Sequence, residues 1–314
     1  MKIRIKTPAR LHLGLIDLNG NLGRLYGSIG LAVNYPNVVL EAESAEKLEV
    51  YGLEKDRTAK AVSRFSAYYN IDPKIHLEIK EAISKHSGLG SGTQLSLAVG
   101  TALARIHGIK ASAPEIASVM GRGFVSGVGV AAFERGGFSV DGGLNVLYQT
   151  PPQAVFHQNF PKDWVFVVAV PKLKKGLSGK QEKEAFQGII PGLEKNASEI
   201  SRLVLMKMLP SLLEKDIESF GFALTEIDKK TGEYYKDIPQ DKTSAIIMQH
   251  MIGLGAHGAG QSSWGPAVYG LIEKKYAAGL DNEIKEFLSE NKIAGKVFIA
   301  EADNKGAVIE KISS

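Results

Sequence analysis

HSGLGSGTQ, from His86 to Gln94, joins a glycine loop to the start of an amphipathic helix. After it, apolar residues recur at intervals of three and four up to residue 106, which predicts one buried helix face. Before it, Ile75, Leu77 and Ile79 alternate with polar residues, as in a strand with one buried face. A strand, a glycine loop and a helix in this order direct unpaired backbone N–H groups and the helix dipole at one point, which suits an anion.

We expect this loop to bind phosphate. The residues predicted to contact it are Gly88, Leu89, Gly90, Ser91, Gly92, Thr93 and Gln94. Their spacing matches neither the P-loop nor the dinucleotide-binding fingerprint, so those two classes of site lose their main support. The alternative is a tight connection with a purely structural role.

Two other segments carry glycine motifs of the same kind. The first, PARLHLGLIDLNG, runs over residues 8–20, and the second, GQSSWGPAVYGL, runs over residues 260–271. With the central loop they resemble, in order and over nearly the whole chain, the three motifs of the GHMP kinase superfamily. Together with GLGSGTQLSLAVGTALA (88–104) and SGVGVAAFERGGFSVDGG (126–143), they are most similar to the β-ribofuranosylaminobenzene 5'-phosphate synthase branch of that superfamily.

The differences from the kinase pattern agree with that branch. Where many GHMP kinases carry a catalytic Asp, this chain has Gly129, which cannot accept or orient a proton. Ser84 and Gly92 also stand where the kinase loop usually has a proline and a second Ser or Ala. We expect a loop reshaped for another phosphate ester.

The pattern of mixed strands and segregated helices predicts an α+β fold. The resemblance implies a ribosomal-protein-S5-domain-2-like N-terminal domain over residues 1–150 and a ferredoxin-like C-terminal domain over residues 151–314. The boundary is placed at Thr150-Pro151-Pro152, where every periodic pattern is broken. A β-hairpin is expected across Asp141-Gly142-Gly143.

The resemblance implies an enzyme that joins phosphoribosyl pyrophosphate to 4-aminobenzoate or 4-hydroxybenzoate. CO2 and pyrophosphate are released and a C-riboside 5'-phosphate is formed, as in methanopterin biosynthesis. Mg²⁺ (or Mn²⁺) is the expected metal, and no organic cofactor is expected. Two alternatives stay open: an ATP-dependent small-molecule kinase, and a catalytically inactive relative that senses a ligand.

The catalytic residues that we predict are Asp17, Arg24 and Arg10. The planar fork of an arginine suits phosphate or the benzoate carboxylate, although either arginine can also be a surface residue. Asp17 is the candidate either for binding the metal or for facing the positive charge that develops at the ribose C1. Its alternative role is to form the turn before Asn19-Gly20.

A further set of side chains is predicted to bind substrate: His12, Gln261, Ser262, Ser263, Trp264 and Lys180. Trp264 would stack on the benzoate ring, or else pack in the core. His12 serves equally well as a packed strand residue, and Lys180 as one of a run of solvated lysines.

Composition restricts the class of protein. The 314 residues are 44% hydrophobic, carry a formal net charge of +4 and include no cysteine. The small basic excess, without a run of basic and aromatic residues, argues against nucleic acid as a partner, and disulfides and thiolate metal sites are excluded. No segment reads as a signal peptide or a membrane span. We therefore expect a cytoplasmic enzyme with no membrane partner. The resemblance implies small-molecule substrates, and a homodimer is a possible assembly.

Overall fold

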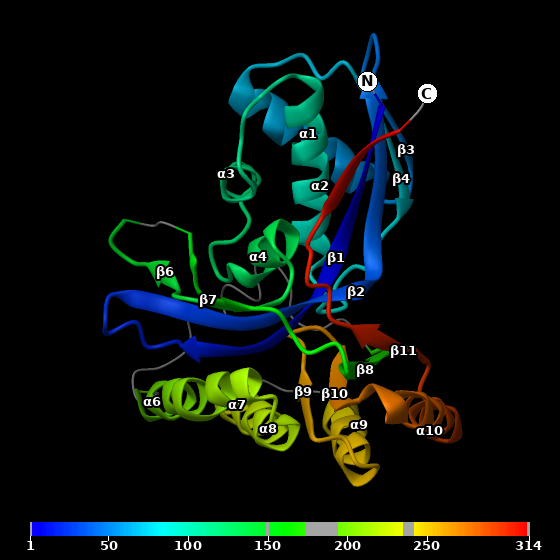
Figure 1. Ribbon diagram of the computed structural model, residues 1–314. Helices are drawn as coiled ribbons and strands as arrows, with labels where there is room; N and C mark the ends of the chain where they lie inside the picture. The colour runs from blue at the N-terminus through cyan, green and yellow to red at the C-terminus, as the bar shows by residue number, and fades with distance from the viewer. Residues whose placement is uncertain (1, 149–150, 174–193, 235–241, 313–314) are drawn as a thin grey trace.

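The computed structural model describes residues 2–148, 151–173, 194–234 and 242–312, and within them the chain forms two sheets with helices packed on them (Figure 1). A larger sheet has the strand order β12-β1-β2-β4-β3, and β5, β6 and β7 extend it beside β2. A smaller antiparallel sheet has the order β11-β8-β10-β9. The α+β class that the sequence predicts is confirmed.

Two long antiparallel strands form the backbone of the larger sheet. They are β1 (Lys2–Asp17) and β2 (Arg24–Ser44), paired from Lys2 opposite Glu43 to Asp17 opposite Tyr26. The predicted strand before the glycine loop is β4 (Ile75–Glu81), which pairs with β2 and runs parallel to β3 (Glu49–Gly52). Its three apolar residues are buried, as the alternation predicts.

Four helices lie beside the upper part of this sheet in Figure 1: α1 (Lys55–Tyr69), α2 (Ser91–Ile106), α3 (Ala113–Val119) and α4 (Val128–Glu134). Every residue of α2 from Gln94 to Ala104 is buried, because the helix contacts the sheet as well as α1, α3 and α4. The helix that the periodicity predicts after the glycine loop is therefore confirmed.

The smaller sheet is buried on both faces. Its strands are β8 (Trp164–Pro171), β9 (Gly258–Gln261), β10 (Val268–Glu273) and β11 (Gly295–Glu301). Val165 and Val167 belong to a cluster with α9 (Lys242–Gly253) and α10 (Ala277–Glu290). Phe166 and Val168 face the main core, which includes residues of α6 (Glu194–Leu203), α7 (Leu209–Glu214) and α8 (Ile217–Glu233). The alternation of faces at successive residues is the two-residue period of a strand.

Strands from the second half of the chain return to the larger sheet. They are β7 (Ala154–Gln158), which pairs with β5 (Phe138–Asp141), and β12 (Val308–Ile312), which pairs with β1. The division into domains at residue 150 stays a prediction, and pairing in the sheets crosses it twice.

The expected hairpin across Asp141-Gly142-Gly143 is wrong. β5 and β6 (Leu144–Asn145) both pair with β2, at different positions along it. The carboxylate of Asp141 accepts the backbone N–H of Gly143 at 2.9 Å, so a side chain closes this turn. Alternating apolar residues show which face of a strand is buried, but they do not identify its partner.

The two glycine loops touch without side chains between them. A Cβ atom at Gly265 would overlap the backbone of Ser87 and Gly88, and one at Gly88 would overlap the carbonyl oxygen of Ser262. Gly88 also has φ +87°, a conformation that L side chains rarely adopt. Glycine at both positions is therefore a requirement of the contact between the loops.

Replacing Gly265 by Ala should destabilise the protein by about 1–3 kcal/mol, because the added methyl group forces two backbones apart. Gly279→Ala is the matched control, since a Cβ in that helix meets nothing within 4 Å. It should leave the stability unchanged or raise it by up to about 1 kcal/mol. Denaturant unfolding of the three proteins measures both effects, and equal stability of Gly265→Ala and wild type would contradict the packing described.

Candidate active site

One serine hydroxyl joins the three glycine motifs. Ser262 Oγ donates to the carbonyl oxygen of Gly88 at 2.8 Å and accepts the backbone N–H of His12 at 2.9 Å. The backbone N–H of Ala267 donates to the carbonyl oxygen of Ser87 at 3.2 Å. Segments 250 residues apart in the chain thus meet at one buried side chain, as the resemblance implies.

Arg10 lies directly beneath the central loop. Its backbone N–H donates to the carbonyl oxygen of Leu89 at 3.2 Å, and its guanidinium donates to the carbonyl oxygen of Gly88. A Cβ at Gly90 would stand 3.0 Å from Arg10 Cγ, and Gly90 has φ +83°. Arg10 therefore supports the shape of the loop and places a positive charge against it.

The first turn of α2 leaves its backbone donors open. Gly90 is the N-cap and has no side chain to cap the turn, and the N–H of Gln94, which donates to the carbonyl of Gly90, is the first to be paired. Across the described part of the chain, no acceptor meets the N–H groups of Ser91, Gly92 or Thr93. Unpaired donors at the positive end of a long helix form an anion-binding site.

Gly129 borders this turn. Gln94 Nε2 donates to its carbonyl oxygen at 2.8 Å, and a Cβ at Gly129 would lie 3.2 Å from Thr93 Cγ2. A side chain at position 129 would therefore press against Thr93, in the first turn of α2. In this chain α4 carries no carboxylate at that position.

Asp17 and Arg24 lie at the other end of the hairpin formed by β1 and β2. Seven residues of strand separate Asp17 from Arg10, which corresponds to roughly 23 Å. Asp17 Oδ1 accepts the N–H groups of Asn19 at 2.6 Å and Gly20 at 3.0 Å, so it forms the turn that was its alternative role. The exposed Arg24 donates from Nη2 to the carbonyl of Gly143 at 3.1 Å. The structure thus brings Arg10 and His12 to the loop, and places Asp17 and Arg24 apart from it.

A carboxylate that the sequence analysis missed connects the start of α4 to β2 and to the turn that Arg24 contacts. Asp141 is buried and accepts the N–H groups of Gly127 at 2.8 Å, Gly143 at 2.9 Å and Ser28 at 3.1 Å. Burial raises the pKa of Asp141 to about 6, although these hydrogen bonds act in the opposite direction. It fixes the start of α4, beside the anion site, to the turn that Arg24 holds.

The third motif rests on a second such carboxylate. The backbone N–H of Gln261 donates to Asp228 Oδ1 at 2.8 Å, and burial raises the pKa of Asp228 to about 6. Gln261 Nε2 donates to the carbonyl of Gly265 at 2.9 Å. Ser263 has φ +58°, and Trp264 packs partly buried against the main core. Gln261 and Trp264 thus stabilise the conformation of the loop. In the sequence, the glycines of this motif were the only signal of such a role.

His12 is neutral. Burial, reinforced by the nearby charge of Arg10, lowers its pKa to about 3. It is therefore available as a neutral hydrogen-bonding group and not as a cation for a carboxylate. Lys180, the remaining predicted substrate contact, lies outside the described residues.

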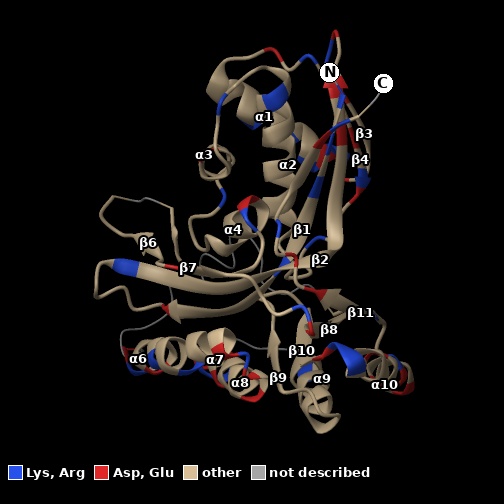
Figure 2. Ribbon diagram, viewed as in Figure 1, with Lys and Arg blue, Asp and Glu red and all other residues tan. Residues whose placement is uncertain are grey.

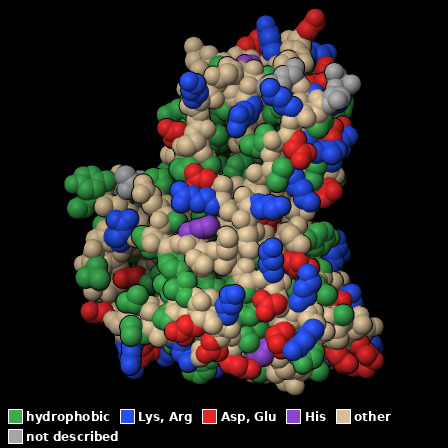
Figure 3. Space-filling view, in the orientation of Figure 1, with side chains coloured by type: hydrophobic (Ala, Val, Ile, Leu, Met, Phe, Trp, Pro, Cys, Tyr) green, Lys and Arg blue, Asp and Glu red, His purple; other side chains and the backbone are tan. Residues whose placement is uncertain are grey.

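No metal centre or charged field competes with this site on the surface described. Within residues 2–148, 151–173, 194–234 and 242–312, no group of three or more His, Asp or Glu could hold a metal ion. Charged residues of both signs are spread over the helices and strands (Figure 2), and basic and acidic side chains intermingle on the face in Figure 3. No described helix is long and apolar enough to span a membrane.

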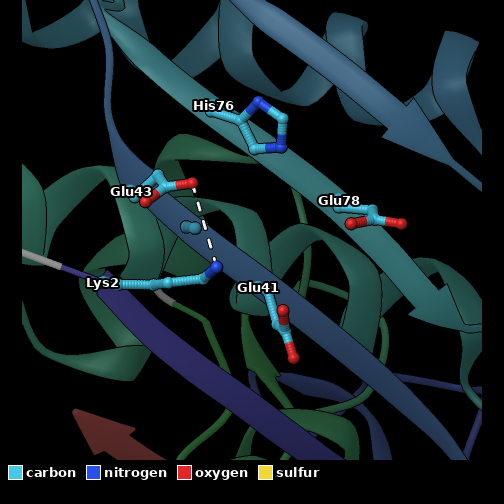
Figure 4. A pocket seen from close by; sticks show the side chains of 6 residues that line it. Lys2, Glu41, Glu43, His76 and Glu78 are labelled. Carbon is cyan, nitrogen blue, oxygen red and sulfur yellow. Dashed lines mark ion pairs between the residues drawn. The ribbon is translucent and has the colours of Figure 1, made fainter. Parts of the chain in front are cut away.

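A small polar pocket lies elsewhere, on the strands β1, β2 and β4 (Figure 4). It holds about 20 Å³, room for little more than a water molecule. Each of its three glutamates forms an ion pair, Glu43 with Lys2 at 3.9 Å, Glu41 with Arg4 at 2.7 Å and Glu78 with Lys80 at 2.5 Å. It contains none of the motif residues, so the junction of the glycine loops remains the candidate active site.

Comparison with known proteins agrees with this geometry. Residues 56–137 match the GHMP kinases N terminal domain. The beta-ribofuranosylphenol 5'-phosphate synthase of Methanothermobacter thermautotrophicus is 36% identical over 99% of both chains. The synthase of the same name from Archaeoglobus fulgidus is 34% identical over 98% of this chain and 99% of the relative.

The fold is shared more widely. The crystal structure of homoserine kinase from Cytophaga hutchinsonii superposes with a TM-score of 0.69 at 16% identity, over 98% of this chain and 97% of that one. An identity this low supports the fold alone. The identity to the two synthases over almost the full length decides the family: the chain belongs to the beta-ribofuranosylphenol 5'-phosphate synthases, enzymes with the GHMP kinase fold.

Proposed function

We propose that this enzyme condenses phosphoribosyl pyrophosphate with 4-aminobenzoate or 4-hydroxybenzoate. The carboxylate leaves as CO2, pyrophosphate leaves from the ribose C1, and the ring carbon forms a bond to C1. The proposal rests above all on one observation: position 129, where a kinase base would face the phosphate site, is a glycine packed against Thr93. The names of the two archaeal relatives point in the same direction.

The proposed reaction requires little proton transfer by side chains of the protein. The para amino or hydroxyl group donates electrons to the ring carbon that carries the carboxylate, which makes that carbon the nucleophile. The protein has to bind the phosphates, stabilise charge at C1 and hold the two substrates together. The buried carboxylate of Asp141, which is bonded to the start of α4, already accepts three backbone N–H groups. It is therefore poorly suited to act as a kinase base.

The open N–H groups of α2 are the proposed phosphate ligands, with Arg10 adding charge from below the loop. Asp17 and Arg24 stay part of the proposal as catalytic residues, and the Asp17 variant below tests whether the turn of the hairpin acts on the substrates. Mg²⁺ suits a site with one carboxylate because it commonly completes its coordination with substrate phosphates and water. Asp17 would hold it, and the ion would offset the negative charge of the departing pyrophosphate. A homodimer and a cytoplasmic location remain parts of the proposal.

The purified enzyme, given phosphoribosyl pyrophosphate, Mg²⁺ and carboxyl-labelled 4-aminobenzoate or 4-hydroxybenzoate, should release labelled CO2 and pyrophosphate in equal amounts without ATP. Unsubstituted benzoate is the control and should release neither, because its ring carbon lacks the electron donor. Transfer of the γ-phosphate of ATP to a small alcohol, without decarboxylation, would establish the kinase alternative instead.

Asp17→Asn separates chemistry from turn formation, because the amide keeps an oxygen that can accept the N–H groups of Asn19 and Gly20. If the charge acts in the transition state, a loss of about 3 kcal/mol should lower kcat and kcat/KM together by roughly a hundredfold, with little change in melting temperature.

Asp303→Asn is the matched control for this variant. Asp303 Oδ1 accepts the N–H groups of Lys305 at 2.9 Å and Gly306 at 3.0 Å, which is the same kind of turn away from the site. Its activity should equal that of the wild type. Wild-type turnover in Asp17→Asn would assign Asp17 to the turn alone.

A further inference from the structure

An arginine outside the predicted motifs stands at the first turn of α2. A Cβ at Gly92 would lie 3.2–3.3 Å from the guanidinium atoms of Arg122, so the guanidinium is stacked closely on that turn. Arg122 Nε donates to Ser96 Oγ at 3.4 Å. The residue is exposed, which leaves its remaining donors within reach of a ligand.

The surroundings of Arg122 have an excess of positive charge. Protein atoms around the guanidinium, and then the charges of Arg57 and Arg64 on α1, lower the pKa of Arg122. Arg57 and Lys85 share one oxygen of Glu54, each at 3.1 Å, and Arg64 donates to the carbonyl of Val119.

Arg57 and Arg64 thus add positive charge near Arg122, and the carboxylate of Glu54 is paired to Arg57 and Lys85. Among the described residues, no carboxylate forms an ion pair with Arg122 or Arg64. Like charges repel, so this arrangement costs stability unless an anion binds there. The open N–H groups of Ser91, Gly92 and Thr93 also favour an anion at this first turn of α2.

We infer that Arg122 is a phosphate-binding residue of this enzyme, which contacts a phosphoryl group seated on the first turn of α2. The inference rests on the proposed function, and it assigns the guanidinium to one of the two phosphorylated ends of phosphoribosyl pyrophosphate. A planar guanidinium offers two parallel donors to a phosphate, which a lysine cannot do. Arg57 and Arg64 add positive charge near it without being required to touch the ligand.

The test measures binding without turnover. Calorimetry with ribose 5-phosphate and with pyrophosphate, each alone, should show that Arg122→Gln weakens the binding of one of them by about tenfold or more, the effect expected for loss of hydrogen bonds to a charged group. The affinity of Arg122→Lys for that ligand should lie between the affinities of Arg122→Gln and the wild type. Arg105→Gln is the matched control, because it removes the same charge from an exposed residue in the last turn of α2, and it should change either affinity by less than twofold.

The outcomes separate this inference from the proposed function. Wild-type affinity of Arg122→Gln for both ligands would overturn the inference and leave the function intact. Equal losses in Arg122→Gln and Arg105→Gln would also overturn it, since they would reflect net charge and not a contact. If the wild type binds neither ligand but binds ADP in a manner that depends on Arg122, the anion contact is supported and the proposed sugar substrate is wrong.

Discussion

The hydrogen bonds to the carbonyl oxygen of Gly88 hold the candidate site together. The hydroxyl of Ser262 and the guanidinium of Arg10 both donate to it, so the central glycine loop, the first strand and the third motif are joined at one atom. The neutral hydrogen bond from Ser262 contributes about 1 kcal/mol and the charged one from Arg10 about 1.5–3 kcal/mol, and their loss here would leave buried polar groups unpaired, which costs more. The close contact of Gly88 with Gly265 then fixes the distance between the loops. The open N–H groups of Ser91, Gly92 and Thr93 follow directly after the loop that these contacts hold in place.

The structure separates the residues predicted for the site into two groups. Arg10 and His12 lie against the central glycine loop, and Asp17 and Arg24 lie at the turn of the same pair of strands. Asp141 connects the start of α4 to the turn held by Arg24, through three backbone N–H groups. Gly129 packs against Thr93 in the first turn of α2, at the position where many GHMP kinases carry their base.

Local patterns predicted the local structure well. The apolar spacing after residue 94 predicted α2, and the alternation at Ile75, Leu77 and Ile79 predicted β4, because burial of one face imposes a period on the sequence. The partners of strands carry no such signal. The pairing of β12 with β1 and of β5 with β2 in place of a hairpin could not be predicted from the pattern. The meeting of the three motifs followed only from the family resemblance. The roles of Asp141 and Asp228 depend on burial from distant segments, which no single stretch of sequence reveals.

A crystal structure of the enzyme with phosphoribosyl pyrophosphate and Mg²⁺ would show directly whether the first turn of α2 holds phosphate. Phosphate oxygens should lie at about 2.7–3.2 Å from the backbone nitrogens of Ser91, Gly92 and Thr93, with Ser262 still bonded to Gly88. A ligand whose phosphates all lie elsewhere, with these three N–H groups facing only water, would contradict this prediction.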